Sequence, residues 1–397
     1  MRLNYKPIGD YVNLVEERNK ELQDLPLIGL SITKQFIPSI ANTIGTDMST
    51  YRTIYKNQFA YCAVTSRNGD KLTIALFKDL DKGLISQAYT PFEVTDTNEV
   101  LPEYLMMWFS RLEFDRYARF KSHGSARELF NWEDLCESLM PIPSITKQKE
   151  IVAEYITIQN RIDLNKRLIQ KLEETAQAIY KNWFVDFEFP DENGKPYKSN
   201  GGEMVVSELG EIPKGWVVGT LKAIMNYSNS RIELKTLNLN TYISTENMIQ
   251  DRGGIIPANS LPSALSITKF VVGEILISNI RPYFKKIWLA EFIGGCSNDI
   301  LCISPKKGFS SLFLFYILEQ DMFFEYVMAG SKGTKMPRGD KNWIMNYSVV
   351  IPDTNILTGF TKTAKVVSEK STAKKNEKKK LEELKSLLLS KLATIEN

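Results

Sequence analysis

The clearest periodic pattern in the chain is a seam of apolar residues after Pro143. These residues recur at alternating steps of four and three, which is the heptad pattern of a coiled coil and predicts one long helix over 144–184. Ser144 or Thr146 can cap its start, and Pro190 follows its end. At about 1.5 Å per residue, this helix would be about 60 Å long. The seam positions are Ile151, Tyr155, Ile158, Ile162, Asn165, Ile169, Leu172, Ala176, Ile179 and Trp183.

A second helix with a weaker seam is predicted after Pro352. Its ends are apolar, but residues 368–380 contain six lysines and two glutamates. One polar residue in a seam fixes the register, whereas several in a row predict a loosely packed or solvated centre. The alternative for the first helix is an amphipathic helix lying on its own domain. The second seam consists of Phe360, Ala364, Val367, Ser371, Lys374, Lys378, Leu381, Lys385, Leu388 and Leu392.

The two helices belong to a repeat with an offset of 209 residues. The matching landmarks are Gly124 and Gly333, Ile142-Pro143 and Ile351-Pro352, and Leu172-Glu173-Glu174 and Leu381-Glu382-Glu383. A weaker upstream similarity pairs Ser31 with Ser244 and Arg67 with Arg281, so a few residues are inserted or deleted between the blocks. Solenoid repeats have periods of about 20–50 residues. The chain therefore reads as two copies of a whole module.

Each copy begins with a mixed, strand-rich stretch, as in 59–65 and 71–77 around the turn at 67–70. Proline and glycine are frequent in 189–215, which predicts a linker long enough for the second helix to turn back along the first. The predicted fold is α+β, with two pseudo-symmetric globular domains separated by two long antiparallel helices that form a coiled coil. The predicted segments are 1–142 (first domain), 143–188 (helical spacer), 189–215 (linker), 216–350 (second domain) and 351–397 (C-terminal helical spacer).

Catalytic motifs are scarce. The sequence has no GxxxxGK[ST] phosphate loop, no GxGxxG turn and no GxSxG elbow. Four scattered cysteines and one histidine favour free thiols over a zinc site, so we expect no metal. A nuclease-like set from Asp353 and Glu377 can be forced, but the two would lie about 36 Å apart along one helix. We expect no catalytic residue, no secretory signal and no membrane span, and hence a cytoplasmic protein.

Basic residues surround a glycine at the same place in both copies. Glycine lets a backbone approach a phosphate closely, and Arg or Lys reach phosphates and the O6/N7 edge of guanine. A solvated surface turn is the alternative for either loop, but the recurrence favours a DNA-binding role. The candidate DNA-binding residues are Arg67, Arg119, Lys121, His123, Ser125, Arg127, Arg281, Lys285, Lys332, Thr334, Lys335 and Arg338. The lysine cluster at 370–380 reads instead as a solvated helix face.

Several segments resemble the specificity subunits of Type I restriction-modification systems. These are 141–151 and 172–189, which resemble the central region of that family, 208–216, which resembles the entry to its second recognition domain, and 124–135, which resembles the end of the first. The resemblance implies a non-catalytic subunit with two target-recognition domains. Each domain would read one half of a bipartite sequence in double-stranded DNA, and the helices would set the gap between the halves.

The resemblance also implies partners. Two methyltransferase subunits would dock on the helices, and restriction (motor) subunits would join them; S-adenosylmethionine, ATP and Mg would belong to these partners, with no cofactor on this chain. The segment 183–189 either helps to dock a methyltransferase or caps the helices. Two other functions remain open, a two-headed coiled-coil adaptor that binds proteins and a stand-alone metal-dependent nuclease. The candidate coiled-coil and partner residues are Ile151, Tyr155, Ile158, Ile162, Asn165, Ile169, Leu172, Ile179, Trp183, Phe184, Phe360, Leu381, Leu388 and Leu392.

Overall fold

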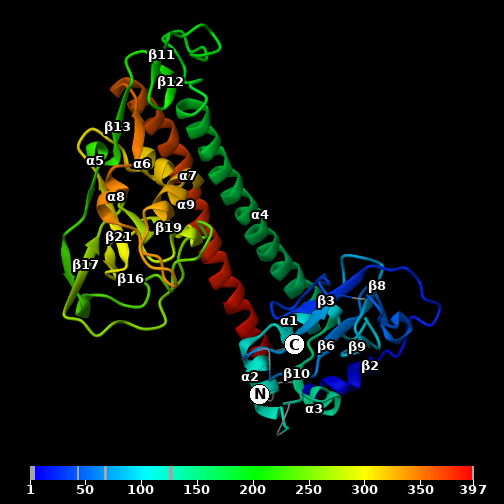
Figure 1. Cartoon of the computed structure of the whole chain (residues 1–397). Coiled ribbons are helices and arrows are strands. Elements are labelled where there is room, and N and C mark those ends of the chain that lie inside the picture. Colours follow the sequence, from blue (N-terminus) through cyan, green and yellow to red (C-terminus); the bar gives the residue numbers. More distant parts are fainter. Residues whose placement is uncertain (1–4, 43, 67–68, 125–127, 396–397) are drawn as a thin grey trace. The chain divides into compact units, whose positions relative to one another are not determined.

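The computed structural model describes residues 5–42, 44–66, 69–124 and 128–395. Two compact units make up the chain: unit 1 is Met1–Lys166 with Lys375–Asn397, and unit 2 is Arg167–Lys374. Two long helices, α4 (Ile145–Phe184) and α9 (Thr354–Lys391), each run without interruption through the unit boundary (Figure 1). Each unit therefore contains one half of α4 and one half of α9.

Most of the other elements have a counterpart in the other unit. Unit 1 contains β1 (Tyr5–Pro7), η1 (Ile8–Tyr11), β2 (Val12–Leu14), β3 (Leu27–Ser31), β4 (Gln35–Pro38), η2 (Met48–Thr50), β5 (Arg52–Tyr55), β6 (Phe59–Cys62), β7 (Ile74–Leu76), β8 (Lys82–Ile85), β9 (Tyr89–Val94), α1 (Pro102–Phe109), α2 (Leu112–Lys121), α3 (Trp132–Glu137), β10 (Leu139–Pro141) and η5 (Leu392–Thr394). Unit 2 contains β11 (Met204–Ser207), β12 (Gly210–Pro213), β13 (Val217–Thr220), α5 (Leu221–Ile224), β14 (Met225–Tyr227), β15 (Arg231–Glu233), η3 (Leu234–Thr236), β16 (Tyr242–Ile243), β17 (Ser266–Phe270), β18 (Ile275–Ser278), η4 (Pro282–Phe284), β19 (Ile287–Leu289), β20 (Gly294–Cys296), β21 (Ile300–Pro305), α6 (Ser311–Leu318), α7 (Asp321–Ala329), α8 (Lys341–Met345) and β22 (Ser348–Ile351).

One four-stranded sheet has the same topology in both units. Its order is β2-β9-β6-β7 in unit 1 and β14-β21-β18-β19 in unit 2, and every pair is antiparallel. The helices α1 and α6 begin 209 residues apart, as do α2 and α7, and α3 and α8. Each unit also ends on an antiparallel pair directly before its long helix, β1 with β10 and β13 with β22. The sequence repeat is therefore a repeat of folded units.

The second four-stranded sheet of each unit differs at one edge. Three strands correspond, because β8 pairs parallel with β3 and antiparallel with β5, while β20 pairs parallel with β16 and antiparallel with β17. The fourth strand is β4, beside β3, in unit 1, but β15, beside β17, in unit 2. The fourth strand therefore lies at opposite edges of the three corresponding strands in the two units.

Both long helices contribute to the hydrophobic core of each unit. In unit 1, Ile151 and Val152 from α4 are buried, and Leu388 and Leu389 from α9 pack against the same cluster. In unit 2, Tyr180 and Phe184 from α4 pack with Phe360 from α9. Burying apolar side chains is the main favourable term in folding. The helices are consequently part of both cores.

The halves of α4 and α9 run antiparallel within each unit. In unit 1, Lys385 Nζ donates to Gln159 Oε1 at 2.5 Å and Arg161 Nε lies 2.6 Å from Glu377 Oε1, so a later α4 residue meets an earlier α9 residue. In unit 2, Trp183 near the end of α4 packs on Phe360 near the start of α9. All positions of both predicted seams are buried or half-buried. These contacts agree with the antiparallel pairing expected from the sequence.

The polar seam positions are less exposed than a solvated centre would be. Asn165 in unit 1 is fully buried, and neither its Oδ1 nor its Nδ2 has a hydrogen-bond partner among the described residues. Ser371 in unit 2 is also buried, with its hydroxyl unpaired in the same described set. Lys385 is half-buried, and its Nζ lies 5.1 Å from the centroid of the Tyr155 ring. Lys374 and Lys378, the other polar positions in the centre of the second seam, are half-buried, so this centre is not fully solvated, while loose packing stays a prediction.

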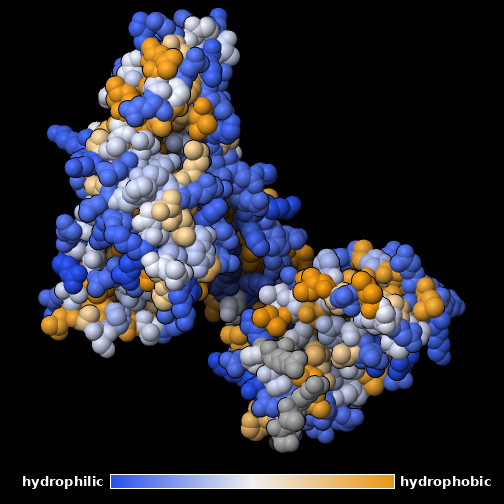
Figure 2. Space-filling model, viewed as in Figure 1, coloured by the Kyte–Doolittle hydropathy of each residue, from blue (hydrophilic) through white to orange (hydrophobic). Residues whose placement is uncertain are grey.

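The glycine- and proline-rich segment 189–215 is folded, which differs from an extended linker. Within it, β11 and β12 form an antiparallel hairpin. Phe189 stacks on both Tyr197 and Trp216, with ring centroids 4.6 and 5.0 Å apart. Apolar residues such as Val206, which is 87% exposed, remain on the hairpin surface, and Figure 2 shows orange residues among the hydrophilic ones where this hairpin lies.

The aromatic segment 183–189 closes the core of unit 2. Phe184 and Phe189 are buried, and Phe184 contacts Phe313, Phe360 and Trp216. Of the two roles considered for this segment, the packing shows the capping contact, while docking of a methyltransferase stays a prediction. No helix in the described part of the chain is long and apolar enough to cross a membrane.

Candidate nucleic-acid interface

In unit 2, residues 332–338 form a closed loop between α7 and α8. Lys332 and Arg338 exchange two backbone hydrogen bonds of 3.0 and 2.9 Å, which hold the two ends of the loop together. Gly333 has a φ of 92°, a conformation that other residues rarely adopt, so the turn requires glycine here. The loop side chains Lys332, Thr334, Lys335 and Arg338 are all exposed. The predicted basic loop is therefore an anchored surface loop.

Unit 1 has a loop with the same closure between α2 and α3. His123 and Leu129, each 209 residues before Lys332 and Arg338, exchange backbone hydrogen bonds of 3.1 and 2.9 Å. Gly124 has a φ of 136°, which explains why glycine recurs in the repeat. His123 is exposed. The predicted residues Arg67, Ser125 and Arg127 lie outside the described residues.

Both loops are fastened to the segment that follows a central sheet strand. After β18, the Arg281 backbone N–H donates to the Pro337 carbonyl at 2.8 Å; after β6, the Thr65 N–H donates to the Glu128 carbonyl at 3.0 Å. Pro337 and Glu128 are 209 residues apart, so the partner of Arg281 in the repeat is Thr65. The sequence pairing of Arg281 with Arg67 was wrong by two positions, because the upstream loops differ in length.

Among the described residues, carboxylates lie beside the candidate cations Arg119, Lys121, Lys332 and Arg338. Arg338 lies 2.6 Å from Asp299 and Lys332 lies 2.8 Å from Asp340. The hydrogen bond with Asp340 raises the pKa of Lys332, and the same bond lowers the pKa of Asp340. In unit 1, the ion pairs are Arg119 with Glu128 at 2.7 Å, and Lys121 with Asp134 and Glu137 at 3.8 Å each. Exposed pairs of this kind are weak, so a phosphate can compete for the cations.

Two strained loops meet beside the unit 2 loop. Arg281 and Lys285, which flank η4, have φ values of 50° and 49°, and the consecutive residues Asp251 and Arg252 have φ values of 54° and 62°. The Asp251 and Arg252 N–H groups donate to the carbonyls of Phe284 and Lys285 at 2.8 and 3.0 Å. A left-handed conformation costs a non-glycine residue about 1–3 kcal/mol and persists where the surroundings enforce it, often at functional sites.

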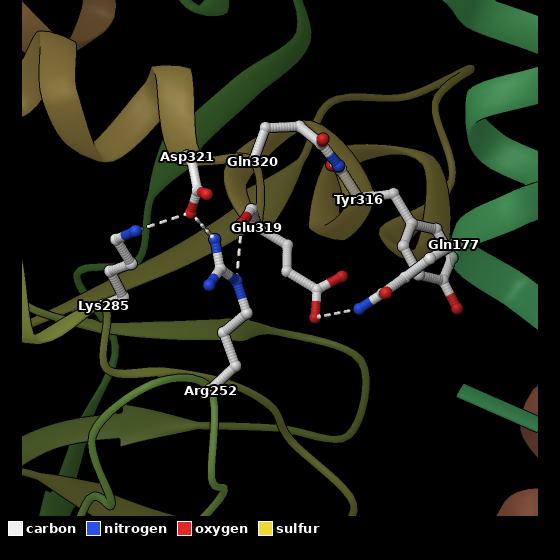
Figure 3. A network of polar contacts seen from close by, with 7 residues as sticks. All are labelled: Gln177, Arg252, Lys285, Tyr316, Glu319, Gln320 and Asp321. Atoms are coloured by element: carbon white, nitrogen blue, oxygen red, sulfur yellow. Dashed lines mark hydrogen bonds and ion pairs between the residues drawn. The ribbon is translucent and has the colours of Figure 1, made fainter. Parts of the chain in front are cut away.

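Asp321 at the start of α7 ties both loops together. Its carboxylate accepts from Lys285 Nζ at 2.7 Å and also from the Arg252 guanidinium, and these bonds lower the pKa of Asp321 to about 2. Arg252 Nε donates in addition to the Glu319 carbonyl at 2.8 Å. Figure 3 shows Arg252 reaching between Asp321 and Glu319. Lys285, a predicted DNA contact, is thus engaged within the protein.

Sequence reasoning missed Arg252 and the carboxylates Asp299 and Asp321. The run Asp251-Arg252-Gly253-Gly254 carries a turn signal that could have drawn attention to Arg252. No local pattern marks Asp299 or Asp321, because their partners are 39 and 36 residues away in sequence. Among the described residues, no group of three or more His, Cys, Asp or Glu side chains could hold a metal ion.

The duplicated domain, the two long helices and the loop that closes in the same way in each unit define a protein built from two copies of one module, and the chain is similar to known proteins. Its curated relatives are specificity subunits of Type I restriction enzymes. It is 28% identical over 139 residues to the HindI specificity subunit of Haemophilus influenzae, covering 34% of this chain and 30% of that protein. It is 26% identical over 307 residues to the MjaIX specificity subunit of Methanocaldococcus jannaschii, covering 74% of this chain and 68% of that protein.

A solved structure shares the fold across the whole chain. The S subunit of a Type I restriction-modification system from M. genitalium matches with a TM-score of 0.57 and 13% identity, covering 100% of this chain and 97% of that one. No family model matches the sequence. The likeness to known specificity subunits thus rests on the curated relatives and on this shared fold.

Proposed function

We propose that this chain is the DNA-recognition subunit of a Type I restriction-modification complex. Its two domains, 1–142 and 216–350, would each read one half of a bipartite target in double-stranded DNA, and the helical segments 143–188 and 351–397 would set the separation of the halves. The observation that carries the proposal is the pair of basic loops with identical backbone closure, one in each unit.

The loop geometry suits recognition of a duplex. Lys335 and Thr334 lie exposed at the end of the unit 2 loop, available to phosphates, and Arg338 is 56% exposed on its side-chain surface although Asp299 orients it. A pre-oriented guanidinium can form the two parallel hydrogen bonds that read guanine in the major groove. The strained 281–285 segment, held by Asp321, supplies a rigid neighbour for this loop.

Partner subunits would supply the chemistry. Two methyltransferase subunits would bind this chain and carry S-adenosylmethionine, and restriction subunits would carry ATP and Mg; this chain would bind none of these cofactors. In this division of labour, the chain chooses the DNA site and acts as a non-catalytic scaffold. The relatives named above, which are specificity subunits, support this assignment.

Mapping of methylated adenines in the host genome tests the proposal. Deleting the gene for this chain should remove methylation from one bipartite motif, and replacing residues 216–350 with those of another specificity subunit should change one half of that motif only. Unchanged methylation after deletion, or a change in both halves after the exchange, would contradict the proposal.

The two other candidate functions predict different results. A protein-binding adaptor would show no sequence preference for DNA, even with the cognate methyltransferase present. A stand-alone nuclease would cleave DNA as a purified chain with magnesium. Filter binding of the complex to matched and scrambled duplexes, and a cleavage assay of the chain alone, separate these outcomes.

A further inference from the structure

A cavity of about 430 Å³ opens in unit 1 between the α1–α2 corner and the long helices. The corner contributes Ser110, Arg111 and Leu112, α4 contributes Gln159 and Ile162, and α9 contributes residues between 382 and 390. All of these residues belong to unit 1. The proposed DNA-reading loops do not use this cavity, so it requires an explanation of its own.

The 209-residue repeat shows why the cavity exists. Ser110 corresponds to Glu319 in unit 2, and Ser386 corresponds to Gln177. In unit 2, these two larger side chains meet, since Gln177 Nε2 donates to Glu319 Oε1 at 3.3 Å, and Glu319 is only 8% exposed (Figure 3). Leu389 likewise replaces the buried Tyr180. Unit 2 fills the site with its own side chains, and two serines and a leucine leave it hollow in unit 1.

The charges at the two equivalent sites also differ. Unit 2 places a carboxyl group in the site, whereas unit 1 places cations around it. Arg111 is 7% exposed, its guanidinium lies 4.1 Å from the Trp108 ring centroid, and its Nε has no hydrogen-bond partner among the described residues. Lys385 also lines the cavity, and its Nζ donates to Gln159 Oε1. Their equivalents in unit 2 are the uncharged Gln320 and Ala176.

The acids at the rim do not cancel these cations. Glu113 Oε2 lies 3.4 Å from Arg111 Nη2, but its side chain is 54% exposed, so water screens this pair. Glu382 is exposed and lies 3.7 Å from Lys378. A guanidinium buried away from water loses solvation, and an anion in the cavity that accepts a hydrogen bond from its Nη atoms would offset part of that loss.

We propose that the cavity of unit 1 is a binding site for a short aliphatic carboxylate, whose charge contacts Arg111 and Lys385 and whose carbon chain lies against Leu112, Ile162 and Leu389. The ligand would take the place that the Glu319 side chain occupies in unit 2. This inference is independent of DNA recognition, because it rests on the packing of the α1–α2 corner against the helices.

Thermal unfolding of the full chain with butyrate, at constant ionic strength, tests the site. Butyrate should raise the unfolding midpoint in a saturable way, whereas its uncharged analogue butyramide should not. Arg111→Gln should weaken butyrate binding about tenfold to a hundredfold, the range for a charge-assisted hydrogen bond. Arg116→Gln, which removes an exposed cation from α2 that does not line the cavity, should leave binding unchanged.

A second variant keeps the test decisive if Arg111→Gln folds poorly. The double substitution Ser110→Glu with Ser386→Gln copies the unit 2 pair into unit 1. It should abolish the response to butyrate, because the new carboxylate occupies the place proposed for the ligand. Equal responses to butyrate and butyramide, or a wild-type response in the double variant, would overturn the proposal.

Discussion

The stability of unit 2 should depend on the ionisation of Glu319. This residue is 8% exposed, one carboxyl oxygen accepts a hydrogen bond from Gln177, and the other has no partner among the described residues. Burial raises the pKa of Glu319 from its ordinary value of 4.5 to about 7, against smaller opposing effects from Gln177 and Arg252. Glu173 adds a small contribution that raises it further.

The direction of the pH effect follows from this raised pKa. Between pH 4.5 and about 7, folded Glu319 keeps its proton while the unfolded chain has lost it, so stability falls as pH rises through this window. The two pKa values differ by about 2.5, and at 1.36 kcal/mol for each unit the loss is about 3 kcal/mol in order of magnitude. Above the window, the buried carboxylate carries the full penalty.

Glu319→Gln isolates this contribution. Glutamine has nearly the same shape and still accepts from Gln177, but it carries no charge. Urea unfolding followed by tryptophan fluorescence should give the variant about the same free energy of unfolding as the parent at pH 4.5, and about 3 kcal/mol more at pH 8. Glu325→Gln, which neutralises an exposed acid on α7, is the matched control. A difference that does not change between pH 4.5 and 8 would refute the reasoning.

Two further substitutions and one insertion test other parts of the molecule. Arg338→Ala should weaken binding to one half-site by about 1–3 kcal/mol, measured by filter binding of the assembled complex. The exposed control Lys307→Ala should leave binding unchanged. An equal loss at both half-sites would argue against independent domains. Asn165→Leu should raise the free energy of unfolding, measured in urea, by about 1–3 kcal/mol, because it removes a buried amide that has no hydrogen-bond partner among the described residues. A free energy of unfolding below that of the parent would show that the amide does form hydrogen bonds. Four residues inserted near the middle of α4 lengthen it by about 6 Å, so methylation mapping should find a changed gap between half-sites, and an unchanged gap would exclude α4 as the spacer.

The long helices and the repeat could be predicted from the sequence because their signals are local or periodic. The heptad seam predicted a helix over 144–184, and α4 spans Ile145–Phe184. The recurring glycine predicted equivalent loops, since only a residue tolerant of positive φ fits both turns. The folding of 189–215 could not be predicted in this way, because it depends on Phe189, Tyr197 and Trp216 meeting across the segment.

The candidate site was predicted only in part, for a similar reason. Exposed cations in the two loops are visible in the sequence, but the carboxylates that orient them are not. Asp299 and Asp321 come from other elements and reach Arg338 and Lys285 only after folding. The equivalence of Arg281 with Thr65 likewise follows from the hydrogen bond that each makes to the loop backbone. The pattern of charged residues in the sequence therefore located the two loops but not the carboxylates that orient their side chains.

The end points chosen for an exchange of the second recognition domain decide which core contacts the chimera keeps. An exchange of 216–350 removes Trp216, which stacks on Phe189 in the core, and cuts β22, which pairs with β13. An exchange of 221–347 would retain Trp216 and the whole β13–β22 pair, although it would still replace the α6 residues that pack against the long helices. Because the fourth strand already differs between the units at opposite sheet edges, the fold tolerates variation there. The shorter exchange should therefore give a more stable chimera that still changes one half-site, as thermal unfolding and methylation mapping can show.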